Sequence, residues 1–148
     1  MKIMILSVGG SAEPIVNAIK WGKPDRVFFF CSRGPKGSEP TIAAPGDPCG
    51  DTRKVKCAAC GNEQYIGDPK GKAIADQAGI DPSRYEVVAV DNPDDLWECY
   101  AAVRELLVGI EEKHGPRCEV IANYTGGTKT MSVAMVLADL ITEQCDLA

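Results

Sequence analysis

The sequence has no run of apolar residues close to the about 18–20 that a membrane-spanning helix needs. Its first apolar stretch ends at Gly9-Gly10 and has neither the length nor the small-residue cleavage site of a signal peptide. We therefore expect a cytoplasmic protein that makes no membrane contact.

Basic residues and histidine are also scarce. The chain has 16 Lys and Arg against 21 Asp and Glu, a net charge of −5. Duplex nucleic acid is bound largely through many basic phosphate contacts, so we expect no duplex partner. The only histidine, His114, falls at the end of a predicted helix, where a cation favourably caps the C-terminus. A Ser-His-Asp mechanism therefore has little support.

What the chain does have is the composition of one soluble globular domain. It is 148 residues long, with 45% hydrophobic and 25% charged residues. This is enough apolar material for a real core and excludes disorder along the whole chain. No internal repeats or sustained heptads are present, which excludes solenoids and coiled coils.

Apolar runs and helical spacing alternate along the sequence. The apolar runs predict strands over 2–8, 26–31, 85–90 and 118–123, and the opening of a fifth at 145–148. Helical spacing predicts helices over 12–22, 70–79, 95–113 and 129–142. This order is typical of an α/β fold with a Rossmann-like, mostly parallel sheet and flanking helices. We expect residues 1–148 to be a single ligand-sensing domain, a fragment lacking its last strands.

Four side chains at or in the predicted helices carry specific expectations. We expect Ser11 to cap the first helix, with Pro14 tolerated because it lies in the first turn. Trp21 and Trp97 have apolar neighbours at helical spacing, which favours packing over base stacking.

Residues 32–69 interrupt the alternation and predict an irregular insertion after the second strand. A small hairpin is expected there, with arms at 55–57 and 64–66. Arg33 and Lys36, just past the second strand, are candidates for the rim of a ligand site, although charged loop residues are usually only solvated.

The seven cysteines are an odd number, which in a reducing compartment favours free thiols or metal ligands over disulfides. Cys57-x2-Cys60 lies in the expected hairpin turn, and Cys49 can supply a third ligand and Cys31 a fourth. A structural zinc would keep the insertion ordered, but plain thiols fit equally well. No cofactor is required besides that possible zinc. The remaining cysteines lie in regular elements and are predicted core residues: Cys99, Cys118 and Cys145.

Two glycine turns follow predicted strands, one at residues 7–11 and one at residues 123–130. Ligands of open α/β sheets bind beyond the carboxyl ends of the strands, where a helix N-terminus offers unpaired amides to an anion. The second turn, Thr125-Gly126-Gly127-Thr128-Lys129, combines glycines for close approach, hydroxyl donors and a positive charge. Neither turn has the spacing of a Walker A loop or of G-x-G-x-x-G. A tight strand-to-helix turn without a ligand is the alternative for each.

The segment Asn-Tyr-Thr-Gly-Gly-Thr-Lys-Thr-Met-Ser at 123–132 resembles the signature of the CRISPR-associated Rossmann fold (CARF) family. The segment Ile-Leu-Ser-Val-Gly-Gly-Ser at 5–11, followed by Glu13-Pro14, is similar to that family's N-terminal motif. The resemblance implies the sensor domain of a type III CRISPR antiviral defence protein, which binds a cyclic oligoadenylate second messenger. It also implies a homodimer, with the ring across the two-fold axis, and a C-terminal effector domain that is absent from this chain.

Carried over by position, Gly9, Gly10 and Ser11 line one side of the ring. The residues that hold its phosphates and riboses are then Thr125, Gly126, Gly127, Thr128 and Lys129. Some relatives cleave the ring slowly, and Lys129 with Thr128 or Ser11 can assist that chemistry. Catalytic residues stay unassigned, because a simple binding site needs the same groups.

Two readings outside this family stay open. The same turns suit a metabolic α/β enzyme acting on a mononucleotide or a phosphorylated metabolite. Such an enzyme needs a general base near the strand ends, where the sequence offers few candidates besides Asp91 and Glu13. A zinc-stapled protein-interaction domain without a small ligand is the third reading.

Overall fold

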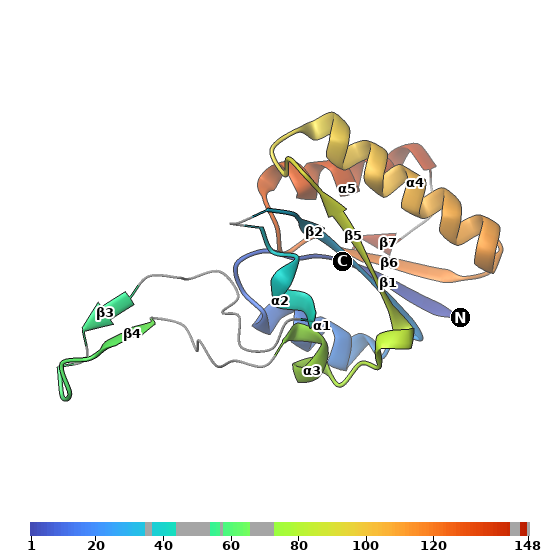
Figure 1. Ribbon diagram of the computed structural model, residues 1–148. Coiled ribbons are helices and arrows are strands. Elements are labelled where there is room, and N and C mark those ends of the chain that lie inside the picture. Colours follow the sequence, from blue (N-terminus) through green and yellow to red (C-terminus); the bar gives the residue numbers. More distant parts are fainter. Residues whose placement is uncertain (35–36, 44–53, 57, 66–72, 143–145, 148) are drawn as a thin grey trace.

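The computed structural model describes residues 1–34, 37–43, 54–56, 58–65, 73–142 and 146–147. Over these ranges the chain forms one five-stranded sheet and a separate two-stranded hairpin (Figure 1). The strands of the large sheet are β1 (Lys2–Ser7), β2 (Arg26–Ser32), β5 (Tyr85–Val90), β6 (Glu119–Asn123) and β7 (Asp146–Leu147). Their order is β5-β2-β1-β6-β7, and every neighbouring pair is parallel. The predicted parallel α/β architecture is confirmed.

Helices cover both faces of this sheet. Their bounds are α1 (Glu13–Gly22), α2 (Pro40–Ala43), α3 (Ile74–Ala78), the 3₁₀ turn η1 (Pro82–Arg84), α4 (Leu96–His114) and α5 (Lys129–Thr142). In Figure 1, α1, α2 and α3 lie on one side of the sheet, and α4 and α5 lie side by side on the other. The described chain thus has three layers, with the sheet in the middle.

The central strands are buried on both faces, which explains why they read as continuous apolar runs. Ile3 and Ile5 of β1 pack into the core under α4 and α5, whereas Met4 and Leu6 pack into the core on the α1 side. Strand β2 alternates in the same way, with Phe28 and Phe30 on one side. This period of two sets the register of the sheet and makes a one-residue slip costly.

The insertion contains more regular structure than the sequence indicates. The hairpin is confirmed, with strands β3 (Lys54–Lys56) and β4 (Glu63–Tyr65) paired antiparallel one residue earlier than expected. Helix α2 was not predicted, because its four residues are too few to show helical periodicity. The predicted helix over 70–79 is described only from Ile74, with left-handed Gly79 as its C-cap. The predicted fifth strand is present as β7.

The N-terminal cap expected of α1 is wrong, whereas α4 has a side-chain cap. Helix α1 begins at Glu13 after Ala12, and no side chain caps it, so Ser11 lies outside the helix. Pro14 lacks an amide hydrogen, which removes one of the donors that a cap would satisfy. Asp95 caps α4 by accepting hydrogen bonds from Trp97 N and Glu98 N.

The packing role expected of the two tryptophans is wrong for Trp21 and limited for Trp97, whose ring makes an edge-to-face contact with Tyr100 at 5.9 Å between ring centroids. Trp21 is 87% exposed and Trp97 is 78% exposed. Each lies two residues, or about 200° around the helix, from a buried residue of its own helix: Ile19 for Trp21 and Cys99 for Trp97. Apolar neighbours in the sequence therefore misled the expectation, because the buried faces are set by other positions. Within the described ranges, no helix is long and apolar enough to cross a membrane.

Candidate functional site

A crevice opens where β1 and β6 lie side by side at the centre of the sheet. The chain leaves β1 towards α1 on one face of the sheet and leaves β6 towards α5 on the other. A topological switch point is the place where two neighbouring strands of a sheet have connections that leave on opposite faces. Ligands of open α/β sheets bind there. Both glycine turns of the sequence follow these two strands, so the fold brings them together as expected.

The hollow at this point has a volume of about 270 Å³. Three parallel strands contribute residues to this hollow. They are the residues that follow β1, the last residue of β2 and the turn after β6. The loop before α4 closes one side. Its lining residues are Val8, Gly9, Gly10, Ser32, Ser38, Pro93, Gly127, Thr128 and Met131. The wall therefore includes residues from the insertion as well as from the two predicted turns.

The two glycine turns are packed backbone against backbone. A Cβ on Gly9 would overlap Gly127 N and lie 3.1 Å from Gly127 Cα, and a Cβ on Gly126 would overlap the carbonyl oxygen of Ser7. Ser7 Oγ also donates to the carbonyl of Gly126 at 2.7 Å. Gly127 has a φ of +76°, in the left-handed region that favours glycine. These glycines are therefore needed to join the turns, whatever ligand the turns hold.

Side chains of the second turn hold its shape. Asn123 Oδ1 accepts hydrogen bonds from Thr125 N at 3.1 Å and from Thr125 Oγ1 at 2.7 Å. Thr128 Oγ1 donates to the carbonyl of Pro93 at 2.6 Å and accepts from Met131 N at 3.2 Å. Both threonine hydroxyl hydrogens are thus used within the protein. Thr128 ties the start of α5 to the loop before α4.

Among the described residues around the crevice, the groups left for a ligand are backbone amides and the side chain of Lys129. The amides of Lys129 and Thr130 begin α5 and donate to no other described residue. Lys129 is exposed and forms no ion pair with any other described residue. Gly10 and Ser11 are exposed on the opposite turn. A 14-residue helix directs the positive end of its dipole to this place, so the site suits an anion.

Two serines of the insertion, Ser32 and Ser38, line the hollow, and the sequence analysis did not predict them as site residues. Ser38 Oγ donates to the carbonyl of Val8 at 2.8 Å, at the base of the first turn. Ser38 N donates to Ser32 Oγ at 3.1 Å, and Ser32 N donates to Ser38 Oγ at 3.2 Å. This reciprocal pair folds the insertion back onto the end of β2. The sequence signal was weak: Ser32 comes directly after the apolar run 26–31, and Ser38 follows six residues later in a segment without periodicity.

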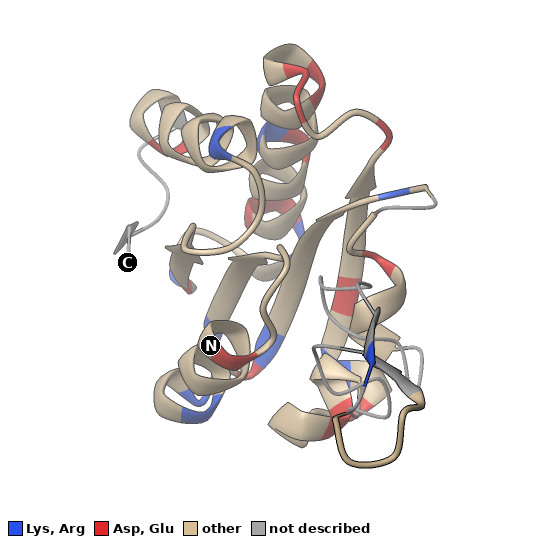
Figure 2. Ribbon diagram, turned by 90° about the vertical axis from the view of Figure 1, so that its left-hand side faces the viewer, with Lys and Arg blue, Asp and Glu red and all other residues tan. Residues whose placement is uncertain are grey.

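Arg33, the basic residue expected at the rim of the site, forms ion pairs with two carboxylates. Arg33 pairs with Asp91 at 2.9 Å and with Glu39 at 3.6 Å. The hydrogen bond and the charge of Asp91 raise the pKa of Arg33 above its ordinary value. Its guanidinium is therefore shared among carboxylates, and the second rim candidate, Lys36, lies outside the described residues. Figure 2 shows basic and acidic positions interspersed along the ribbon.

The metal ligands proposed from the sequence are described only in part. Cys49 and Cys57 lie outside the described residues, and Cys60 is exposed in the hairpin turn. The described residues contain no group of three His, Cys, Asp or Glu placed to hold a metal ion.

The other cysteines differ in burial. Burial raises the pKa of Cys31 to about 12 and that of Cys99 to about 11, so both are inert thiols of the core. Cys118 is half-buried, and Cys145 lies outside the described residues. The predicted core role is thus confirmed for Cys99.

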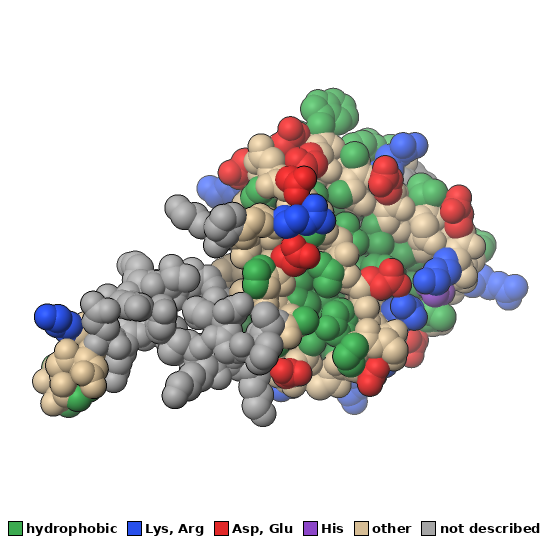
Figure 3. Space-filling model, in the orientation of Figure 1, with side chains coloured by type: hydrophobic (Ala, Val, Ile, Leu, Met, Phe, Trp, Pro, Cys, Tyr) green, Lys and Arg blue, Asp and Glu red, His purple; other side chains and the backbone are tan. Residues whose placement is uncertain are grey.

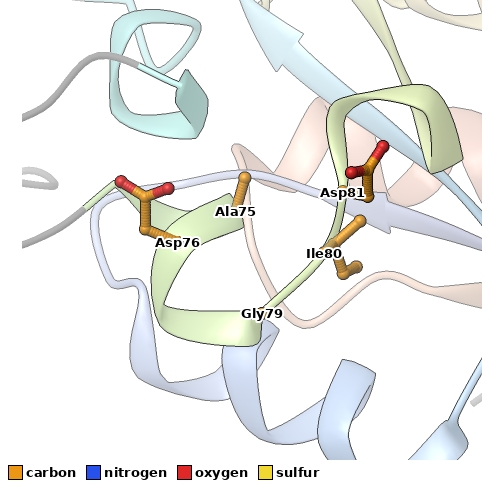
Figure 4. Close-up of a pocket in the computed structure, with 5 residues that line it drawn as sticks. All are labelled: Ala75, Asp76, Gly79, Ile80 and Asp81. Atoms are coloured by element: carbon orange, nitrogen blue, oxygen red, sulfur yellow. The ribbon is translucent and has the colours of Figure 1, made fainter.

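A second hollow lies beside the C-terminus of α3 and is lined by Ala75, Asp76, Gly79, Ile80 and Asp81 (Figure 4). Its two carboxylates stand on different segments and do not point towards one another. Asp81 accepts hydrogen bonds from Ser83 N and Ser83 Oγ, which lower the pKa of Asp81. With two carboxylates and no cation in its lining, this hollow does not suit an anionic ligand.

Comparison with known proteins gives relatives only at the level of structure. No protein-family profile and no curated protein sequence matches this chain. The fold is similar to that of Enterococcus italicus Csm6 bound to cyclic hexa-2′-fluoro-hexa-dAMP, with 16% identity and a TM-score of 0.64. It is also similar to that of Can2 from Sulfobacillus thermosulfidooxidans in complex with cyclic tetra-adenylate, with 15% identity and a TM-score of 0.59.

The likeness extends over 99% of this chain in both cases. It covers 32% of the Csm6 chain and 31% of the Can2 chain, so this chain spans about a third of the length of each. At these identities the likeness concerns the fold. The chain therefore shares the Rossmann-like α/β fold of these two structures.

Proposed function

We propose that this chain is a sensor domain of the CARF type that binds a cyclic oligoadenylate in the crevice between β1 and β6. One observation carries the proposal: two interlocked glycine turns meet at the switch point of the sheet, beside the first amides of α5 and Lys129, none of which is paired with another described residue. The two motifs that resemble the CARF family are these same two turns. Both similar solved structures hold a cyclic oligonucleotide of the adenylate type.

The proposal is for binding and does not include ring cleavage. The only histidine lines a pocket with Glu86 of β5, at the opposite end of the sheet from the glycine turns. The carboxylate of Asp91 is paired with Arg33. Neither group is therefore available as a general base beside the turns.

Replacing Lys129 with Ala tests the proposal. Losing one charge-assisted contact to a phosphate costs about 1.5–3 kcal/mol, so we expect K129A to weaken ring binding at least about tenfold. Lys20→Ala is the matched control, because it makes the same charge change at an exposed position in the last turn of α1. Equilibrium dialysis with labelled cyclic tetra-adenylate and cyclic hexa-adenylate measures both variants. Equal affinities of K129A and K20A would contradict the assignment of Lys129.

We further propose that the domain works as a homodimer. A ring with an even number of adenylates can have two-fold symmetry, and each chain offers one pair of turns, so two copies match the ring best. Helix α5 starts at the site and carries an exposed apolar stripe with helical spacing. Its members are Val133, Leu137, Leu140 and Ile141, with exposed fractions of 48%, 36%, 66% and 64%. Parallel pairing of two copies along this stripe, about a two-fold axis that runs along α5, would bring their turns together.

Sedimentation velocity tests the dimer with and without the ring. Leu140→Glu should produce a monomer, because it places a charge in the stripe. Val108→Glu is the matched control, since Val108 is 38% exposed on α4 outside the stripe. A dimer of unchanged stability in L140E would show that the stripe is not the interface.

We also propose that the cysteines Cys49, Cys57 and Cys60 bind one structural zinc. Support comes from the antiparallel strands that flank Cys57-x2-Cys60 and from Gly61, whose left-handed φ of +71° turns the chain directly after Cys60. Elemental analysis should find close to one zinc per chain. The metal should be lost in Cys60→Ser and retained in Cys118→Ser, and metal-free wild-type protein would contradict the proposal.

A further inference from the structure

A pocket of about 250 Å³ lies between the last turns of α4 and the sheet. It is lined by Phe28, Glu86, Glu105, Leu106, Gly109, Ile110, Lys113 and His114. Phe28 and Glu86 belong to the amino-terminal halves of β2 and β5, and His114 is the last residue of α4. The pocket is therefore at the opposite end of the sheet from the glycine turns. Figure 3 shows exposed hydrophobic side chains between acidic and basic ones on the face that it draws.

The floor of the pocket is apolar and its rim is polar with balanced charge. Phe28, Leu106 and Ile110 form the apolar part. At the rim, Glu86 Oε1 pairs with Arg26 at 2.9 Å and lies 3.6 Å from Lys113 Nζ. Glu105 is the second carboxylate of the lining. Arg26 lies beside the pocket and not in its lining, and together with Lys113 it balances the charges of Glu86 and Glu105, which favours a ligand without net charge.

Two buried nitrogen atoms in this region have no hydrogen-bond partner within the described part of the chain: His114 Nε2 and Arg26 Nε. A buried polar atom without a hydrogen bond lowers the stability of the folded protein, and a ligand that bonds to it removes this loss of stability. His114 lines the pocket, so this unpartnered nitrogen belongs to a side chain of the pocket wall. Glu86 Oε2, which bonds to no described residue, is a second acceptor at the rim.

Gly109 leaves the mouth of the pocket open, although a glycine inside a helix lowers the stability of that helix. It lies in the middle of α4, where glycine is about 1 kcal/mol less favourable than alanine. A Cβ at this position would meet no atom within 4 Å, so packing does not require a glycine there. A larger side chain would instead occupy the mouth of the pocket.

We propose that this pocket is a second binding site, for a small uncharged planar heteroaromatic ring that carries both a hydrogen-bond donor and an acceptor. The apolar floor would take the faces of the ring. Glu86 would accept from its N–H, and His114 would donate to its unprotonated nitrogen. The volume is just below the about 300–1,000 Å³ of sites for drug-sized ligands, which suits one bicyclic ring. The inference does not depend on the binding of a cyclic oligoadenylate.

Benzimidazole is the probe that tests the site, in an NMR titration of the ¹⁵N-labelled chain without any ring ligand. We expect saturable shifts of the Gly109, Lys113 and His114 amides, with a dissociation constant in about the millimolar range. Gly109→Leu should weaken binding at least about tenfold, whereas Gly109→Ala should retain it. Thermal melts confirm that both variants fold. The site would be refuted by shifts elsewhere, by no shifts, or by equal binding to both variants.

Indole tests the polar part of the inference, because it has the N–H but lacks the second nitrogen. Wild-type protein should bind benzimidazole more tightly than indole, and His114→Phe should remove that difference while keeping an aromatic ring in the wall. Equal affinity of the wild type for the two probes would contradict the role of His114.

Discussion

Replacing Gly126 with Ala tests whether the two glycine turns are joined backbone to backbone. The new Cβ would overlap the carbonyl oxygen of Ser7 and lie 3.2 Å from Gly9 N. Both are main-chain atoms at the end of the central strand, so neither can turn aside as a flexible side chain would. Overpacking of this kind costs about 1–3 kcal/mol. With an unfolding entropy of about 2.1 cal/mol/K per residue, the melting temperature should fall by about 3–10 °C.

Scanning calorimetry of G126A against wild type measures this effect. Gly109→Ala is the control, because a Cβ there meets no atom within 4 Å. It replaces a glycine within a helix and should raise the melting temperature by about 3 °C. A G126A protein that melts within about 1 °C of wild type would refute the reasoning, because the two turns would then have room to separate.

Three further predictions concern the start of α5, the reactivity of the cysteines and the pH dependence of stability. Thr128→Val removes the hydroxyl that donates to the carbonyl of Pro93 and should cost about 1–2 kcal/mol, whereas Thr128→Ser should melt close to wild type; equal losses would contradict the hydrogen bond. At pH 8, with a chelator present to remove any bound zinc, iodoacetamide should label the exposed Cys60 and leave Cys31 and Cys99 unmodified until denaturant is added, as read by mass spectrometry. Because burial raises the pKa of these two thiols to about 12 and about 11, the unfolded state loses its protons first as the pH rises above about 9. Stability in urea should therefore fall between pH 9 and pH 11, and a Cys31→Ala, Cys99→Ala double variant should show a smaller slope.

Local patterns in the sequence were enough to predict the parallel sheet. Apolar runs at 2–8 and 26–31 are too short for helices and end at turn residues, so they identify strands buried on both faces. Glycine turns after the first and fourth predicted strands then locate the switch point, because parallel strands share one carboxyl edge. Both steps depend on residues that are neighbours in the sequence.

Contacts between distant segments could not be predicted in this way. Thr128 reads as a phosphate ligand in the sequence, yet its hydroxyl hydrogen goes to Pro93, 35 residues away. Ser38 lies in a segment without periodicity, and its bond to the carbonyl of Val8 exists only once the insertion folds back. Arg33 likewise reads as a free cation until Asp91 and Glu39 are placed beside it. Such partners are set by tertiary packing.

Calorimetric titration of the wild-type chain with cyclic oligoadenylates of three, four and six units tests the central claim most directly. Linear oligoadenylates of the same lengths serve as controls for nonspecific attraction of phosphates to Lys129. We predict saturable binding of a ring with an even number of units, at one ring per two chains, and much weaker binding of its linear counterpart. Absence of binding for every ring, or equal affinity for linear and cyclic forms, would contradict the assignment of the crevice between β1 and β6 as a sensor of cyclic oligoadenylate.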